Sequence, residues 1–178
     1  KVIASISLDE AELPEGVGFY PVYFETEKLP YPIAGMSDEM PYPSTRYCDM
    51  TPEMAAQFEA AFLEVITRAA KECQPDLILC HHLYFLTALV RRHFPAHRVY
   101  GFCHNTDLRQ MCKTDLKREF IREQIRALDR IFVPQEAQRE GTLKIYGADP
   151  GKIETVGMGY NSQIFRPGEA KEADGVTR

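Results

Sequence analysis

The distribution of apolar residues along the chain predicts alternating strands and helices. Short runs rich in β-branched and aromatic residues predict strands at 2–7, 19–24, 77–80, 99–103, 131–133 and 153–156. Apolar positions at helical spacing predict helices at 52–73, 83–94, 114–128 and 135–146. Strands that alternate with helices are typical of βαβ units, whose strands run parallel. The sequence therefore predicts an α/β fold, a Rossmann-like three-layer αβα sandwich with a mainly parallel sheet.

Two segments show neither the short apolar runs of strands nor the apolar spacing of helices. Residues 25–50 contain four prolines and three tyrosines and predict a long loop, which in a compact domain is usually functional. Tyrosine and proline offer rigid surfaces for the apolar faces of sugars, so this loop is a candidate for substrate recognition, with a plain cover over the sheet edge as the alternative. The charged residues 168–178 predict a linker or tail. We expect one domain at 1–167.

Composition narrows the class of protein. Hydrophobic residues make up 44% of the chain and charged residues 26%, as in a soluble globular domain. No apolar run approaches the roughly 18 residues that cross a bilayer. Five cysteines without a C-x-x-C motif favour reduced thiols and a cytoplasmic location. No G-x-G-x-x-G, P-loop or G-x-S-x-G motif occurs, which disfavours dinucleotide enzymes, P-loop kinases and α/β-hydrolases, and we expect no cofactor.

Basic residues gather in the second half of the chain, most regularly as a row of arginines four residues apart. An acidic residue precedes each of the first three by three positions, which predicts a solvated face of internal ion pairs. Contact with anionic lipid at the inner face of the membrane, or with a polyanionic substrate, is the alternative. Aromatic residues are not interleaved with the charges, so no nucleic acid is expected. The row is Arg118, Arg122, Arg126 and Arg130.

Polar side chains follow neighbouring predicted strands. His81 and His82 come after the run at 77–80, and His104, with Asn105, Thr106 and Asp107, comes after the run at 99–103. Ligands of open parallel sheets bind at the carboxyl ends of the strands, where an imidazole can donate to a sugar hydroxyl or act as an acid or base. The alternative is that each histidine caps loop carbonyls.

A metal site is a rival interpretation of the same segments. Cys80 and Cys103 adjoin the histidines, and thiolate and imidazole are the ligands that zinc prefers. Consecutive residues of a strand, however, point to opposite faces of the sheet. We therefore expect both thiols to face a helix layer, and no metal at the histidines.

The order of these segments resembles that of a known family. The quoted residues are PDLILCHH at 75–82, VYGFCHNT at 99–106, LDRIFV at 128–133 and KIETVGMGYNSQIFRP at 152–167. They resemble the N-terminal half of group 1 (family 4) glycosyltransferases of the GT-B fold. The closing motif of that family falls on Gly159, Asn161, Phe165 and Pro167. Asn161 stands where the family has Asp, and Met158 where Asn or Pro is usual.

The resemblance implies a retaining glycosyltransferase that moves a hexosyl group from a nucleotide-sugar to a glycan, lipid or small-molecule acceptor. His104 falls on the family histidine that contacts the transferred sugar and is the implied catalytic residue. The implied first strand and the C-terminal donor lobe lie outside the printed sequence, so the chain alone is expected to be inactive. The expected substrate-binding residues are His81, His82, Tyr84, Asn105, Thr106, Gly159 and Asn161.

Two other functions remain open at this point. A sugar-nucleotide epimerase of the same two-lobed architecture would share the strand rhythm and would need no acceptor. A non-catalytic module that binds sugars or a partner protein would keep the fold without turnover.

Overall fold

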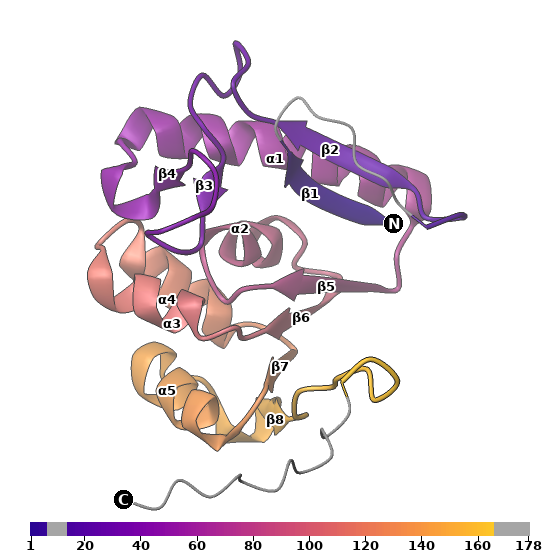
Figure 1. The fold of residues 1–178 in the computed structure, drawn as a ribbon, viewed down its shortest axis with the longest axis vertical. Coiled ribbons are helices and arrows are strands. Elements are labelled where there is room, and N and C mark those ends of the chain that lie inside the picture. The colour runs from indigo at the N-terminus through magenta and orange to yellow at the C-terminus, as the bar shows by residue number, and fades with distance from the viewer. Residues whose placement is uncertain (7–13, 166–178) are drawn as a thin grey trace, which may run out of the picture.

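The main sheet has four parallel strands in the order β5–β6–β7–β8 (Figure 1). The computed structural model describes residues 1–6 and 14–165. The strands are β5 (Leu77–His81), β6 (Arg98–Phe102), β7 (Arg130–Val133) and β8 (Ile153–Thr155). The helices between them are α2 (Phe85–His93), α3 (Thr106–Lys113), α4 (Arg118–Arg126) and α5 (Glu136–Tyr146). The predicted Rossmann-like α/β fold is confirmed.

The N-terminal part forms two smaller pairs of parallel strands. β1 (Val2–Ile6) pairs with β2 (Phe19–Tyr23), and β3 (Ala34–Gly35) pairs with β4 (Thr45–Arg46). Within the described ranges, β2 has a strand on one side only, which suits Pro21 because proline has no backbone N–H to donate. β3, β4 and the 3-10 helix η1 (Tyr47–Asp49) divide the segment predicted as one long loop.

α1 (Pro52–Cys73) begins and ends close to the predicted bounds. The Thr51 hydroxyl accepts a hydrogen bond from the Met54 N–H at 3.2 Å, and Pro52 occupies the first helical position. Phe58, Phe62 and Ile66, which recur at helical spacing, are buried against the core. Capping and apolar periodicity thus act together to fix this helix.

The two faces of the main sheet differ in how they are covered. Register places Ile78, Val99, Ile131 and Ile153 on one face, where helices pack closely. A Cβ on Gly101, on that face, would lie 2.5 Å from the Leu83 side chain, so only glycine permits this approach. On the opposite face the edge strand leaves Leu77 43% and Leu79 49% exposed. Leu77 and Leu79 thus give the outer strand of the sheet an exposed apolar surface.

The prediction of one helix at 114–128 was wrong in its extent. The structure has two helices here, α3 before the predicted start and α4 within it, separated by a turn in which Lys117 has φ 49°. α3 begins shortly after the end of β6, at residues for which no helix was predicted. The acidic Asp107 in its first turn was a signal for a helix start.

The arginine row is only in part the solvated, internally paired face that was predicted. Arg118 pairs with Asp115 and Arg122 with Glu119, each at 3.0 Å. Arg122 also donates to the Ile145 carbonyl at 3.0 Å, and Arg126 donates to the Tyr146 carbonyl. Over the described ranges Arg126 has no ion pair with Glu123. These two guanidinium groups bind the last carbonyls of α5, where a cation is favourable.

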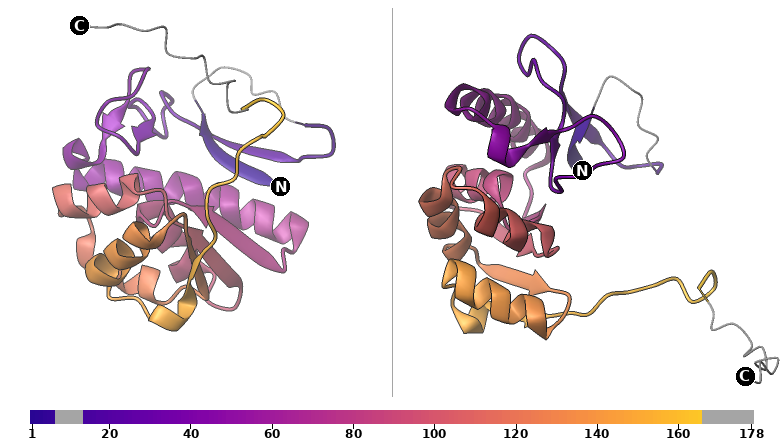
Figure 2. Two further views of the ribbon diagram at one scale, coloured as in Figure 1. Left: turned by 60° about the horizontal axis from the view of Figure 1, so that its bottom comes forward. Right: turned by 60° about the vertical axis from the view of Figure 1, so that its left-hand side comes forward.

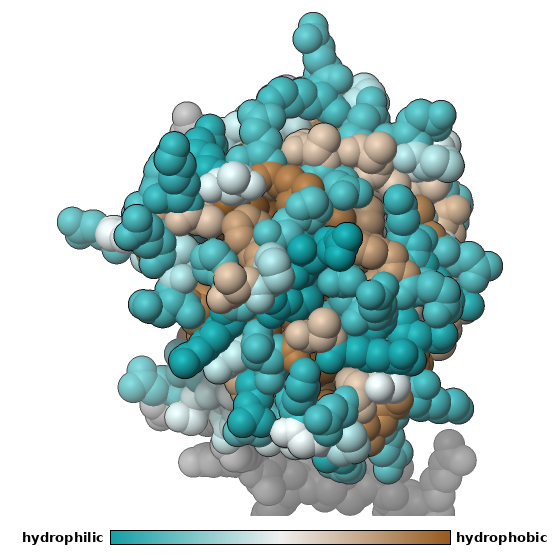
Figure 3. Space-filling model, turned by 180° about the vertical axis from the view of Figure 1, so that it is seen from behind, coloured by the Kyte–Doolittle hydropathy of each residue, from teal (hydrophilic) through white to brown (hydrophobic). Residues whose placement is uncertain are grey.

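Most of the outer surface is polar. Seen from behind, hydrophilic side chains predominate and hydrophobic ones appear in smaller areas between them (Figure 3). Across 1–6 and 14–165, none of the helices is long and apolar enough to cross a membrane. The segment after β8 extends away from the helices (Figure 2). Pro167 and the predicted tail at 168–178 lie outside the described residues.

Candidate functional site

Three imidazole rings gather at one edge of the main sheet. His81 is the last residue of β5, His82 follows it, and His104 lies just beyond the end of β6. His81 Nδ1 lies 2.9 Å from His104 Nε2, and the ring centroids of His82 and His104 are 4.6 Å apart. β5 and β6 are parallel neighbours, so their carboxyl ends bring the two turns together. The predicted common edge for these histidines is confirmed.

Two residues of this cluster hold unusual backbone conformations. His82 has φ 67° and Asn105 has φ 66°, in the region that favours glycine. The His82 N–H donates to the Phe102 carbonyl at 2.9 Å, which extends the strand pairing into the turn. Thr106 Oγ1 lies 3.4 Å from His82 Nδ1. Such conformations persist only where surrounding contacts hold them, and they concentrate at functional sites.

Phe102 forms an aromatic floor under the cluster. Its ring stacks on His81 at a centroid distance of 5.8 Å and an interplanar angle of 20°, and its centroid lies 5.3 Å from that of His104. The alternation of β6 directs this ring to the face opposite Gly101. Phe102 was not among the predicted site residues, although its register in β6 pairs it with His81.

The surroundings of His82 and His104 favour neutral imidazoles. Burial lowers the pKa of His104 below its ordinary value, and the neighbouring His81 lowers it further. Burial, followed by the charge of His104, lowers the pKa of His82 in the same direction. A neutral imidazole offers one N–H donor and one acceptor nitrogen. Near neutral pH the rings can therefore hydrogen-bond hydroxyl groups on either side.

The two neighbouring thiols lie on the helix side, as predicted. Cys103 is buried, and its Sγ lies 3.5 Å from the Asp107 carboxylate. Burial raises the pKa of Cys80 and that of Cys103 to about 12. Thiols bind metals as thiolates, which these environments disfavour. Within the described part of the chain, no three His, Cys, Asp or Glu side chains form a group that could hold a metal ion.

Tyr84 lies in the core rather than in an open cleft. It is 2% exposed, and its ring packs edge-on against Tyr47 at a centroid distance of 4.8 Å. Its hydroxyl is buried without a hydrogen-bond partner among residues 1–6 and 14–165. A buried hydroxyl that lacks a partner costs about 1–3 kcal/mol.

Gly159 and Asn161 are not brought to the histidines. Both lie in the exposed segment 156–165, which extends from the end of β8 (Figure 2). Asn161 accepts a hydrogen bond from the Gln163 N–H at 2.9 Å, and no contact joins it to the histidine cluster in the described ranges. The same segment exposes Met158, Tyr160, Ile164 and Phe165.

The loop at 25–50 does not present its tyrosines as predicted. Tyr31 and Tyr47 are core residues, 7% and 5% exposed, whereas Tyr42 is 46% exposed. The Tyr31 hydroxyl donates to the Met54 carbonyl at 2.7 Å, which anchors the loop on α1. On α3, Gln110 donates to Asp38 at 3.2 Å and Lys113 pairs with the same carboxylate. The prediction of stacking tyrosines was therefore wrong for two of the three.

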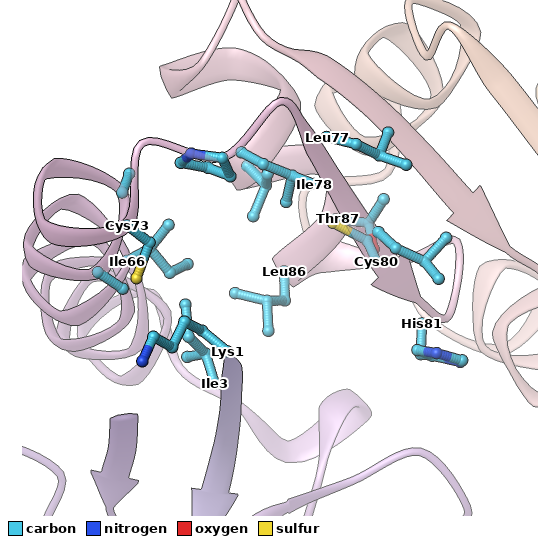
Figure 4. Close-up of a pocket in the computed structure, with 15 residues that line it drawn as sticks. Lys1, Ile3, Ile66, Cys73, Leu77, Ile78, Cys80, His81, Leu86 and Thr87 are labelled. Atoms are coloured by element: carbon cyan, nitrogen blue, oxygen red, sulfur yellow. The ribbon is translucent and has the colours of Figure 1, made fainter. Parts of the chain in front are cut away.

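An apolar cavity of about 280 Å³ lies between the outer edge of β5 and β1. Leu86 of α2 points into it, Lys1 and Ile3 lie on the β1 side, and His81 lies at one end (Figure 4). The edge residues of β5 contribute the opposite wall. The cavity thus separates two strands whose facing edges lack a partner in the described structure.

The structure is an α/β domain whose histidine cluster lies at the carboxyl ends of parallel strands, where open parallel sheets bind their ligands. The family model of Glycosyltransferase Family 4 matches residues 37–163, well over half of the chain and the whole of the main sheet. The chain belongs to glycosyltransferase family 4.

A curated relative supports glycosyl transfer in general. The chain is 36% identical over 47 residues to D-inositol 3-phosphate glycosyltransferase 2 of Catenulispora acidiphila. The aligned segment is 26% of this chain and 11% of that protein. The alignment therefore covers a small part of either protein.

Proposed function

We propose that the chain is the acceptor-binding lobe of a retaining glycosyltransferase of the GT-B fold. The full-length protein would move a hexosyl group from a nucleotide-sugar to a glycan, lipid or small-molecule acceptor. The nucleotide-sugar is the donor substrate, and no cofactor is proposed. Membership of glycosyltransferase family 4 supports a transferase with a sugar donor and an acceptor. The finer assignment rests on the histidine cluster.

The observation that carries the proposal is the contact between His81 and His104 at the sheet edge. Both rings are exposed to solvent, and they lie 2.9 Å apart at their nearest nitrogens. With His104 neutral, an imidazole nitrogen can donate to a hydroxyl of the transferred sugar as charge develops on the ring. We assign this contact to His104. Supporting contacts to substrate are proposed for His81, His82, Asn105 and Thr106.

Tyr84 enters the proposal through its hydroxyl group. That hydroxyl is enclosed in this structure, so its contact with substrate is proposed only through a rearrangement of the residues around it, after which a hydrogen bond would relieve the cost of the unsatisfied group. Gly159 and Asn161 are proposed to meet substrate only after the segment at 156–165 has docked.

Two features support the expectation that the chain is inactive alone. The cavity beside β5 is apolar and lies along an unpaired strand edge, which we propose accepts one more strand that would cover Leu77 and Leu79. The large apolar side chains of segment 156–165 are exposed and suit an interface with a donor lobe. We propose that other parts of the full-length protein supply both.

A transfer assay on the full-length protein tests the assignment of His104. His104→Ala is expected to lower the transfer rate by about 10²–10⁴-fold, the range for a positioned acid–base or hydrogen-bonding group. His97→Ala is the matched control, because that ring packs on Phe94 away from the cluster. A near-normal rate in the His104 variant would remove this residue from the mechanism.

The same assay separates the alternatives. Conversion of a nucleotide-sugar in the absence of any acceptor would favour an epimerase. Calorimetric binding of a nucleotide-sugar without turnover would favour a non-catalytic module. The 178-residue chain by itself is expected to transfer no sugar.

We further propose a cytoplasmic location. All five cysteines are free thiols, which suits a reducing compartment. Contact of the arginine row with anionic lipid is an alternative and not the main proposal. Arg122 and Arg126 already donate to backbone carbonyls of α5, which leaves fewer of their N–H groups for lipid. Sedimentation with phosphatidylserine vesicles tests it, and no co-sedimentation would exclude that contact.

A further inference from the structure

A buried carboxylate joins the two turns that carry the histidines. Asp107, in the first turn of α3, is 0% exposed. Its Oδ2 accepts a hydrogen bond from the Leu83 N–H at 2.7 Å, and both carboxylate oxygens lie 3.2 Å from the His104 N–H. Leu83 follows His82 directly, so one side chain binds the backbone of both turns.

The groups around this carboxylate are all hydrogen-bond donors. They suit a side chain that only accepts hydrogen bonds, and an amide would not match them. The Leu108 N–H and the Cys103 thiol lie 3.1 and 3.5 Å from Oδ1 and complete a set of donors. The peptide groups on either side of Leu83 are held from two elements, because the Tyr146 hydroxyl of α5 donates to the Leu83 carbonyl. An amide in place of the carboxylate would turn an N–H₂ group toward donors.

We propose that Asp107 is a positioning residue, whose carboxylate clamps the turns after β5 and β6 and thereby keeps the three imidazoles together at the sheet edge. Its bearing on sugar transfer rests on the proposed function, whereas the clamp itself rests on the geometry. The left-handed conformations of His82 and Asn105 flank the clamped amides and need such contacts to persist.

The charge of Asp107 also reaches the rings. It raises the pKa of His82 and that of His104, against the larger lowering effect of burial. His104 and His81 lower the pKa of His82, and His81 lowers that of His104. Cys103 and Tyr146 are the other titratable groups beside the carboxylate. If Asp107 acted through packing alone, loss of its charge would not change the pKa of either ring.

The test is a histidine titration by NMR on the 178-residue chain, which needs no sugar. In Asp107→Asn, the pKa of His82 and of His104 is expected to fall, and the ring contact between His81 and His104 to weaken. Asp129→Asn is the matched control, because that carboxylate accepts from the Val99 N–H at 2.8 Å at the other end of the sheet. The control is expected to leave the titrations of His82 and His104 unchanged. Unchanged rings in a folded Asp107→Asn would overturn the proposal.

Hydrogen exchange of the unmutated chain gives a second test that needs no variant to fold. The amides of Leu83 and His104 are expected to be protected although both lie beyond the strand ends, and rapid exchange at both would refute the clamp. Asp107→Glu keeps the charge with a longer side chain and should restore part of the ring contact. In the full-length enzyme, Asp107→Asn should lower kcat more than it raises the donor KM. If no transfer is seen with any variant but the rings respond, the proposed function fails and the clamp stands.

Discussion

The main sheet is held by one aspartate at each end, and the two are bound differently. At the amino end, Asp129 accepts from the Val99 N–H at 2.8 Å and from the Arg91 guanidinium at 2.9 Å. At the carboxyl end, Asp107 binds backbone amides and a thiol, with no Arg or Lys ion pair in the described ranges. Asp129 is 46% exposed, whereas Asp107 is fully buried.

The two ends of the sheet differ in how the charge of their aspartate is balanced. Arg91, 7% exposed, also donates to the carbonyls of Phe94 and His97, so the amino end neutralises its charge and caps α2. The carboxyl end keeps a buried negative charge beside three imidazoles and holds two residues in left-handed conformations. Perturbed pKa values and backbone strain together are typical of functional sites. The comparison therefore supports the proposal that the Asp107 end carries the chemistry.

The largest expected effect breaks the amino end. Arg91→Ala removes a buried cation together with its bonds to two carbonyls and to Asp129, and should lower the free energy of unfolding by about 3 kcal/mol. Urea unfolding of the 178-residue chain measures it. The histidine rings should keep their titrations, because Arg91 acts at the far end of the sheet.

Arg92→Ala is the control for that experiment. Arg92 is exposed on the same helix, so its removal should change stability by less than about 0.5 kcal/mol. If the two variants lose equal stability, the buried ion pair is not what holds the amino end.

Asp129→Asn should have a smaller effect. The amide oxygen can still accept from the Val99 N–H, and the exposed position of the carboxylate limits the value of its ion pair. We expect a loss of about 1 kcal/mol in the same urea experiment. A loss as large as that of Arg91→Ala would mean that the carboxylate, and not the helix cap, carries the stability of this end.

The strands and the histidine edge were predictable from the sequence because they depend on local patterns. Short apolar runs gave β5 to β8 within two residues at each end, and Thr51 with Pro52 fixed the start of α1. Once the strands are parallel, residues that follow neighbouring strands must share an edge. His81 and His104 needed no further information to be placed together.

The clamp and the loop were not predictable in the same way, because they depend on tertiary contacts. Tyr31 and Tyr47 look like exposed loop residues until α1 and α2 pack against them. Arg126 looks like a partner for Glu123 until the end of α5 arrives beside it. Asp107 was one polar residue among several after β6, and its role appears only when the Leu83 N–H points at it.

Backbone strain at the carboxyl end can be sharpened by a pair of glycine substitutions. Asn105→Gly relieves a positive φ and should raise the free energy of unfolding by about 0.5 kcal/mol, the gain being reduced by the entropy of glycine in the unfolded chain. Glu25→Gly is the control, because Glu25 also has a positive φ, of 59°, in the loop after β2. Both should gain stability, but only Asn105→Gly should disturb the His104 ring signals. Equal ring signals in both variants would show that strain at Asn105 does not serve the histidine cluster.

The smallest expected effect is a pH dependence that belongs to the carboxyl end alone. Because the folded pKa values of His82 and His104 lie below the ordinary value of about 6.5, the unfolded chain binds more protons as the pH falls through that value. The contribution of these two rings to the free energy of unfolding should therefore be constant above about pH 7.5 and decline between about pH 6.5 and the lowered values. The lowered pKa values of Asp38, Asp49 and Glu64 act in a separate window, since carboxylates lose their contribution only below about pH 4.5. Urea unfolding at a series of pH values measures the decline, and His104→Gln should make it smaller because one of the two titrating rings is gone. An equal decline in that variant would show that His104 does not contribute to it and would weaken the electrostatic contrast between the two ends of the sheet.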